Sequence, residues 1–417
     1  MRVTERLTRP THVAWMVVGI RSAIVWSIAV SIGISAAVGQ EMTEASKLAL
    51  QHGLEWLAAN QGPQANWESD DLGLVSLGAL AFLADGHFPG RGTYGQPLQR
   101  TLDHILSHAR PNGLLNISPS AQRDMYNHGL STFVLGQAYG MAEDPRLSGV
   151  LNNALQLIAA TQCGDGGWQY AAISMPEGHD LSLVVMQAKA LRSAVDSGFE
   201  VSPQVVRSAI RNVRQHYAPN NNRIDLPEEV QRQLPGQFCY LKNGRNRSVA
   251  MAAAGVVCLQ EFGQYDDWRI GKNMEVIAAA VRQLSTKSEP AMDPYTLYYV
   301  AQAAYQVGDP WWSEIYPILR DYLVRIQVDA PGSIQRRGKW AASGHVNGKP
   351  GDLYATSVAC FVLAIPNRFL PILQEGRIEG LRQQFGPVSR LDRSDGQLSQ
   401  QTARAEVMTT SVRSGGN

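Results

Sequence analysis

Acidic, histidine and aromatic side chains recur at the starts of apolar segments and in the long loops before them. Carboxylates accept hydrogen bonds from hydroxyl or amide groups, and flat rings stack on sugars or peptide side chains. In a concave site this combination favours a carbohydrate or a peptide. The candidate residues are Asp70, Asp71, His128, Trp168, Tyr170, His179, Asp180, Arg247, Asp293, Tyr295, Trp340, His345, Asp352 and Tyr354.

Two chemistries compete with simple binding at these residues. Paired carboxylates such as Asp180 and Asp352 would process a carbohydrate if their oxygens lay about 5–10 Å apart. His128, His179 and His345 would bind a metal ion if they met in space beside an Asp. The simpler explanation is helix capping, because Asp or His at a helix start satisfies free N–H groups. We therefore predict no metal and no cofactor.

Twelve segments have the hydrophobic period of a helix, and almost none alternates as a strand does. Odd-numbered segments are amphipathic, whereas even-numbered ones, such as 71–84, are apolar nearly all round and rich in small residues. A helix that is apolar on every side must be surrounded by protein, so the even-numbered helices should lie inside. We predict an all-α fold, a six-pair α/α toroid. The segments run over approximately 42–60, 71–84, 95–109, 128–142, 146–161, 180–197, 203–217, 247–263, 266–283, 293–307, 310–327 and 353–364.

The long connections all lead into the apolar segments, so they should gather at one mouth of the toroid. Long loops at one end of a rigid scaffold are where function is usually placed. Tyr295, Tyr298, Tyr299 and Tyr305 have helical spacing, and we expect most of them in the core. The long connections are 62–70, 110–127, 163–179, 218–246, 285–292 and 328–351.

One helix-end pattern occurs three times. In each copy a Gln can bond the last carbonyls of a helix, a small residue lets the chain reverse, and an indole returns over the apolar helix end. In the third copy the turn is one residue longer. The copies are Trp56-Leu57 with Gln61, Ala65 and Trp67; Leu157-Ile158 with Gln162, Gly166 and Trp168; and Tyr322-Leu323 with Gln327 and Gly332-Ser333-Ile334.

The ends of the chain differ from its middle. Residues 1–39 combine four Arg with an apolar run, 23–34, and small residues at Ala37 and Gly39, which predicts a secretory signal peptide and an exported protein. If uncleaved, this segment would tether the protein to a membrane. Residues 40–385 should form the toroid, and the polar residues 386–417 predict a disordered tail.

Composition excludes several classes of protein. The 417 residues are 44% hydrophobic and 18% charged, as in a globular protein with a large core. Without the signal, 33 basic and 35 acidic residues remain, so nothing suggests nucleic acid. Four cysteines are too few for a disulfide scaffold. Cys163 and Cys239 lie in loops where an exported protein permits a bridge, and Cys258 and Cys360 should be packing residues.

The repeats resemble those of the squalene-hopene cyclase and protein prenyltransferase superfamily, and more closely its exported repeat proteins. The resemblance covers roughly residues 42–375. It implies the toroid rather than an activity, because the same fold hosts cyclases, zinc prenyltransferases and binding domains. The residues that carry it are Trp56-Leu57 with Gln61 and Trp67, the segment 125–132, the segment 162–168, and the segment 352–357 with 366–372.

The resemblance implies one catalytic motif, the Asp-x-Asp-Asp of class II terpene cyclases, whose middle Asp protonates an alkene. The nearest stretch is Glu68-Ser69-Asp70-Asp71, which would make Asp70 the acid with Glu68 and Asp71 supporting it. Glu68 stands where the family has Asp, and Leu72 where it has Thr. Helix capping by Asp71 explains the same residues.

The sequence lacks the residues that the other activities found on this fold require. The zinc prenyltransferases use Asp-x-Cys and a later His, but no Cys here has Asp two residues before it, and Tyr354-Ala355-Thr356 replaces their Tyr-His-Thr. Cys163-Gly164-Asp165-Gly166 lacks the Gln of a thioester motif.

We therefore expect a non-catalytic binding module that uses the mouth for a small molecule, carbohydrate, isoprenoid or peptide. A class II cyclase with Asp70 as its acid, and a carbohydrate-active enzyme with paired carboxylates, remain the alternatives.

Overall fold

The computed structural model describes residues 42–118, 120–286, 291–333, 335–341 and 351–374. The described chain is predominantly helical, so the all-α class is confirmed. Two sets of helices alternate along it. The inner helices are α3 (Leu72–Ala84), α5 (Asp124–Tyr139), α7 (Leu181–Asp196), α10 (Val249–Glu261), α12 (Pro294–Val307) and α14 (Asp352–Ala364). The outer helices are α2 (Glu44–Ala59), α4 (Gly95–Ser107), α6 (Arg146–Ala160), α8 (Pro203–Gln215), α11 (Trp268–Arg282) and α13 (Trp311–Ile326).

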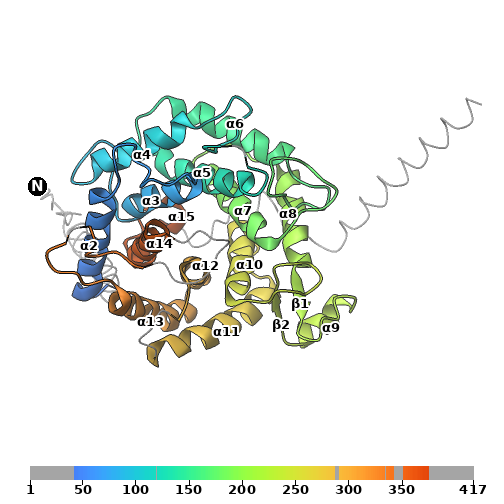
Figure 1. The fold of residues 1–417 in the computed structure, drawn as a ribbon. Helices are drawn as coiled ribbons and strands as arrows, with labels where there is room; N and C mark the ends of the chain where they lie inside the picture. Colours follow the sequence, from blue (N-terminus) through green and yellow to red (C-terminus); the bar gives the residue numbers. More distant parts are fainter. Residues whose placement is uncertain (1–41, 119, 287–290, 334, 342–350, 375–417) are drawn as a thin grey trace, which may run out of the picture.

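The two sets differ in how they bury side chains. In α3 every residue except Leu74 is buried, and the helix begins at Asp71, whose carboxylate accepts a hydrogen bond from Leu74 N–H. Outer helix α8 buries only one face, which includes Val206, Ile210 and Val213 at helical spacing. The apolar and amphipathic patterns of the sequence therefore correspond to inner and outer positions (Figure 1).

The inner helices contact one another in chain order. Helix α3 packs on α5, α5 on α7, α7 on α10, α10 on α12 and α12 on α14, and α14 returns to α3. Small residues permit the close approach: a Cβ on Gly136 of α5 would lie 2.3 Å from Ser193 Oγ of α7. The outer helices lie around this group (Figure 1).

An indole contact is present at all three helix ends, as predicted for the first two copies. The indole Nε1–H groups of Trp67, Trp168 and Trp340 donate to the carbonyls of Leu57, Ile158 and Leu323, each at 2.8 Å. The third copy was misread from the sequence. The turn does not use Gly332 but Gly338, with φ of +86°, and Trp340 follows two residues later; Ile334 lies outside the described residues. An insertion between Gln327 and the turn hid the match.

The glutamines of the pattern connect neighbouring outer helices. Gln61 Nε2 donates to Pro97 O of α4 at 2.6 Å, Gln162 Nε2 to Val205 O of α8 at 2.9 Å, and Gln327 Nε2 to Ala49 O of α2 at 2.8 Å. Each glutamine therefore bonds to a helix beyond the one that it ends.

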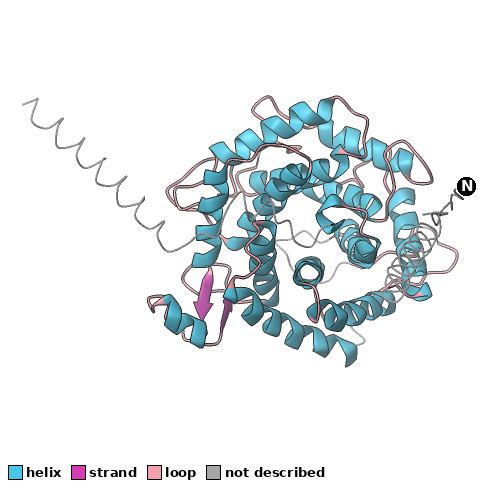
Figure 2. Cartoon of the chain, turned by 180° about the vertical axis from the view of Figure 1, so that it is seen from behind, coloured by secondary structure: helices cyan, strands magenta, loops and turns pink. Residues whose placement is uncertain are grey.

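One long connection contains structure that the sequence did not predict. Within 218–246 lie helix α9 (Glu228–Gln233) and strand β2 (Gly236–Phe238), which pairs antiparallel with β1 (Tyr217–Pro219). Figure 2 shows this excursion at the periphery, beside α8 and α11. Three-residue strands have too little alternation to be recognised from sequence.

The end of the inner helices remote from their N-termini is covered by the chain after α14. Helix η2 (Ile365–Asn367) and the short α15 (Pro371–Gln374) follow, and Leu370, Ile372 and Leu373 are buried. Ile372 N–H donates to Gln137 Oε1 at 3.1 Å, and the Tyr305 hydroxyl donates to Leu373 O.

Several predictions concern segments outside the described residues, including the signal peptide (1–39) and the tail (386–417). In the part of the chain that is described, no helix is long and apolar enough to cross a membrane. Cys163 and Cys239 are both free and buried, so the bridge suggested by their loop positions is absent. Cys258 and Cys360 are buried in inner helices, as expected for packing residues.

Candidate binding pocket

A pocket of about 630 Å³ opens at the N-terminal ends of the inner helices. Five described tyrosines line it, so we call it the tyrosine pocket. They come from α5, α12 and α14 and from two loops. The lining residues are Asp71, Leu74, Ala121, Gln122, Arg123, Tyr126, Asn127, Leu130, Tyr170, Met186, Tyr240, Tyr295 and Tyr354.

Asp180 organises the wall of the tyrosine pocket from behind. It caps α7, and its side chain is 0% exposed. One carboxylate oxygen, Oδ1, accepts from Ser182 N–H at 2.9 Å and from the Ser182 hydroxyl. The other, Oδ2, accepts from the Tyr170 hydroxyl at 2.9 Å and lies 2.7 Å from His179 Nδ1. These contacts satisfy a buried carboxylate without a metal or a lysine.

The tyrosines themselves form a connected wall. The hydroxyls of Tyr170 and Tyr240 lie 2.6 Å apart, and the Tyr126 hydroxyl donates to Ser182 Oγ. The rings of Tyr126 and Tyr170 stack with centroids 5.7 Å apart and planes 18° apart. Burial raises the pKa of Tyr170 to about 12 and raises that of Tyr126 well above its usual value. Both phenols therefore stay neutral at physiological pH.

The charges at the rim balance each other. Arg123 lies 3.4 Å from Asp71 and 4.0 Å from Asp70. Asp71 also accepts from Leu74 N–H at 3.4 Å as the cap of α3. The Asp71 and Arg123 that line the pocket thus form an ion pair with each other, which favours an uncharged ligand.

The structure brings four of the predicted site residues together in the tyrosine pocket: Asp71, Tyr170, Tyr295 and Tyr354. Asp180 is buried behind the wall, whereas His179 is exposed and packs its ring edge-on against Tyr170 at 4.8 Å. Of these six residues, four line the pocket and the other two contact Tyr170.

The proposed cyclase acid has the wrong environment for its task. The Asp70 side chain is 78% exposed, and Glu68 is exposed as well. A general acid that protonates an alkene must be desolvated and face the substrate. Asp70 does neither, and it does not line the tyrosine pocket.

Other predicted site residues have structural partners. His128 is fully buried and bonds to backbone atoms, with its Nδ1 accepting from Leu115 N–H at 3.2 Å. Trp168 and Trp340 are buried indoles of the repeats. Asp293 caps α12 by accepting from Thr296 N–H at 3.0 Å.

Arg247 and Asp352 do not line the tyrosine pocket. Arg247 donates to Gly244 O at 2.8 Å. Asp352 is paired with Lys339, and together with Glu68 it lines a second pocket of about 520 Å³. His345 lies outside the described residues. In the described chain, no group of three or more His, Cys, Asp and Glu side chains could hold a metal ion.

Sequence reasoning missed two of the tyrosines. Tyr126 belongs to the first turn of α5, which begins at Asp124 rather than at the predicted 128. An Asp just before the apolar run was the available signal for this earlier start. Tyr240 comes from the excursion between α8 and α10, and only the tertiary fold brings it within reach of Tyr170.

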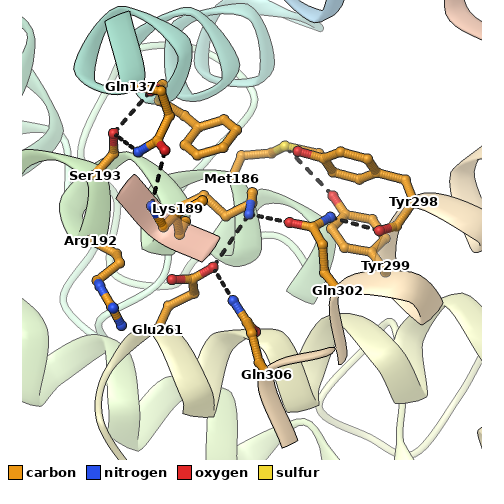
Figure 3. A network of polar contacts seen from close by, with 12 residues as sticks. Gln137, Met186, Lys189, Arg192, Ser193, Glu261, Tyr298, Tyr299, Gln302 and Gln306 are labelled. Carbon is orange, nitrogen blue, oxygen red and sulfur yellow. Dashed lines mark hydrogen bonds and ion pairs between the residues drawn. The ribbon is translucent and has the colours of Figure 1, made fainter. Parts of the chain in front are cut away.

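A buried polar network joins inner helices close to the tyrosine pocket (Figure 3). Lys189 of α7, 1% exposed, lies 3.3 Å from Glu261 of α10 and donates to Gln302 of α12. Gln306 Nε2 donates to the same Glu261 oxygen at 2.8 Å. Met186, which lines the pocket, lies one turn before Lys189 on α7. The interior next to this part of the pocket therefore holds buried polar and charged side chains.

Comparison with known proteins identifies the fold class only. No protein-family profile matches the sequence, and no curated protein matches it. A crystal structure of a protein from Actinoplanes is similar, with a TM-score of 0.50 and 13% identity over 77% of this chain and 98% of that chain. Identity this low supports a shared fold and nothing about activity. The class defined so far is a predominantly helical protein with a tyrosine-lined pocket.

Proposed function

We propose that this protein is an exported, non-catalytic binding module, related to the squalene-cyclase and prenyltransferase repeat proteins, that holds a small ligand in the tyrosine pocket. The observation that carries the proposal is the pocket of about 630 Å³, walled by neutral phenols, whose own Asp71 and Arg123 neutralise each other. Its size is within the roughly 300–1,000 Å³ of small-molecule sites.

The proposed architecture is the six-pair α/α toroid. The closed order of contacts from α3 round to α14 and back to α3 supports it, as does the glutamine pattern that joins the outer helices. Export is proposed from the basic and apolar start of the sequence.

The catalytic alternatives receive less support. A cyclase needs a desolvated acid and a deep apolar cavity, but Asp70 is 78% exposed and the interior holds Lys189 and Glu261. A carbohydrate-active enzyme would need free carboxylates. Asp180 already accepts hydrogen bonds from Ser182 and Tyr170, and Asp352 is paired with Lys339.

Ligand-detected NMR with a pocket-blocking variant tests the proposal. Ala121 lines the pocket and is exposed, so Ala121→Trp fills the mouth without disturbing the core. Ala160→Trp, at an exposed position of α6, is the matched control. In a mixture of methyl glycosides, tripeptides and farnesol, we expect at least one class to receive saturation transfer from the wild type and from the control, but not from Ala121→Trp.

A turnover assay covers the enzyme alternative. Squalene incubated with the wild type should be recovered unchanged. A cyclised product that disappears in Asp70→Asn would refute the non-catalytic function. An NMR mixture in which no component binds differently to the blocked and control variants would refute ligand binding in the tyrosine pocket.

A further inference from the structure

The tyrosine pocket has a defined hydrogen-bond polarity, which begins at Asp180. The Tyr170 hydroxyl donates to Asp180 Oδ2 at 2.9 Å. A phenol has one proton, so in the 2.6 Å contact between the two hydroxyls Tyr240 must be the donor and Tyr170 the acceptor. The proton of Tyr240 therefore points into the wall rather than into the pocket.

The same logic applies on the other side of Asp180. The Ser182 hydroxyl donates to Asp180 Oδ1, and the Tyr126 hydroxyl donates to Ser182 Oγ. The single hydroxyl proton of Tyr126 is therefore also engaged in a hydrogen bond within the wall. Tyr126 and Tyr240, which both line the pocket, have only lone pairs left for a ligand. A buried carboxylate thus makes this wall an acceptor of hydrogen bonds.

An acceptor wall selects a ligand rich in O–H or N–H donors. An isoprenoid has none along its length, so it would desolvate the phenols without replacing their hydrogen bonds, which is unfavourable. An organic cation gains no counter-charge either, because the Asp71 carboxylate that lines the pocket is paired with Arg123, and the positive ends of the inner helices, among them α3, α5 and α12, lie around it.

We infer that the ligand of the tyrosine pocket is a neutral saccharide, an inference that rests on the binding function proposed above. Sugar hydroxyls donate to the lone pairs of Tyr126 and Tyr240, and the apolar faces of sugar rings pack on the half-buried tyrosine rings that line the pocket. Arg123 and Gln122 at the rim supply donors for the remaining sugar oxygens.

Isothermal titration of the full chain with maltotriose, cellotriose, chitotriose and xylotriose tests the inference. We expect at least one of them to bind with a Kd below about 1 mM. Tyr240→Phe removes the acceptor oxygen and keeps the ring, so binding should weaken about three- to tenfold. Tyr139→Phe, at the other end of α5 and packed on Phe199, is the matched control and should bind as the wild type does.

Trialanine, a peptide, and cadaverine, an organic cation, distinguish failure of the saccharide inference from failure of the binding function. If either binds and loses affinity in Tyr240→Phe while the four sugars do not bind, the saccharide inference is overturned and the binding function stands. If no probe binds in a way that Ala121→Trp blocks, both are overturned. Sugar binding that is unchanged in both Tyr240→Phe and Ala121→Trp would place the sugar elsewhere and overturn the inference.

Discussion

His128 shows how burial decides the role of a single residue. The sequence places a His near a helix start, which suggested a ligand. In the fold, its Nδ1 accepts from Leu115 N–H at 3.2 Å, and its Nε2 lies 3.1 Å from Ala154 O. These partners require the neutral tautomer that carries its proton on Nε2. Burial lowers the pKa of His128 to about 4, and that of His216 to about 4 as well.

Stability should therefore fall on mild acidification. Between pH 6.5 and about 4 the unfolded chain binds a proton at His128 that the folded chain excludes, so the free energy of unfolding decreases as pH falls. His128→Gln should reduce this slope by up to about 1.4 kcal/mol per pH unit, measured by urea unfolding from pH 7 to 4.5. His216→Gln should act in the same way. A variant slope equal to that of the wild type would contradict the assignment.

The helix-end pattern operates at the scale of elements. It combines an indole that covers its own helix with a glutamine that bonds to the next outer helix. The reversal between them needs a left-handed residue: Gly166 has φ of +89° and Gly338 has +86°, whereas the first copy places Ala65 at +56°. Gly338 also lies against α2, since a Cβ there would be 2.4 Å from His52 O.

Gly332 and Gly338 lie in one loop, and substituting each by Ala distinguishes the cost of backbone strain from the cost of steric contact. Gly332, with φ of +81°, has open space where a Cβ would lie, whereas Gly338 does not. Gly332→Ala should cost about 1 kcal/mol from strain alone. Gly338→Ala should cost at least about 2 kcal/mol more, because the turn must move away from α2. Thermal unfolding of the two variants measures the difference, and equal costs would show that Gly338 does not hold this contact.

At the scale of the whole molecule, the inner helices are connected through a buried ion pair. Lys189 and Glu261 are 1% and 0% exposed, and the ammonium lies 4.4 Å from the centroid of the Phe133 ring. Desolvation lowers the pKa of Lys189. Together with Gln302, the pair links α7, α10 and α12 (Figure 3).

A double-mutant cycle should reveal this coupling. Lys189→Met leaves the Glu261 charge buried without its partner and should cost about 3–5 kcal/mol of folding free energy. Glu261→Gln with Lys189→Met removes both charges and keeps an amide for Gln306, so the double variant should be more stable than Lys189→Met alone. Chemical denaturation measures all three variants, and additive costs would show that the two residues are not coupled.

The sequence by itself determined the helices, the inner and outer assignment and two of the three repeat turns. These follow from hydrophobic period, capping residues and turn chemistry, which act within a few neighbouring residues. For the same reason it identified Tyr170, Tyr295 and Tyr354, which stand at or before helix starts.

Only the tertiary structure decided what the site is. It left Asp70 in solvent, used His128 and Trp168 for the fold, and placed Tyr240 next to Tyr170, 70 residues away in the chain. The direction of the protons in that wall depends on a carboxylate that packing makes inaccessible. Burial and long-range contact set the chemistry of these groups, and neither quantity is encoded in local sequence pattern.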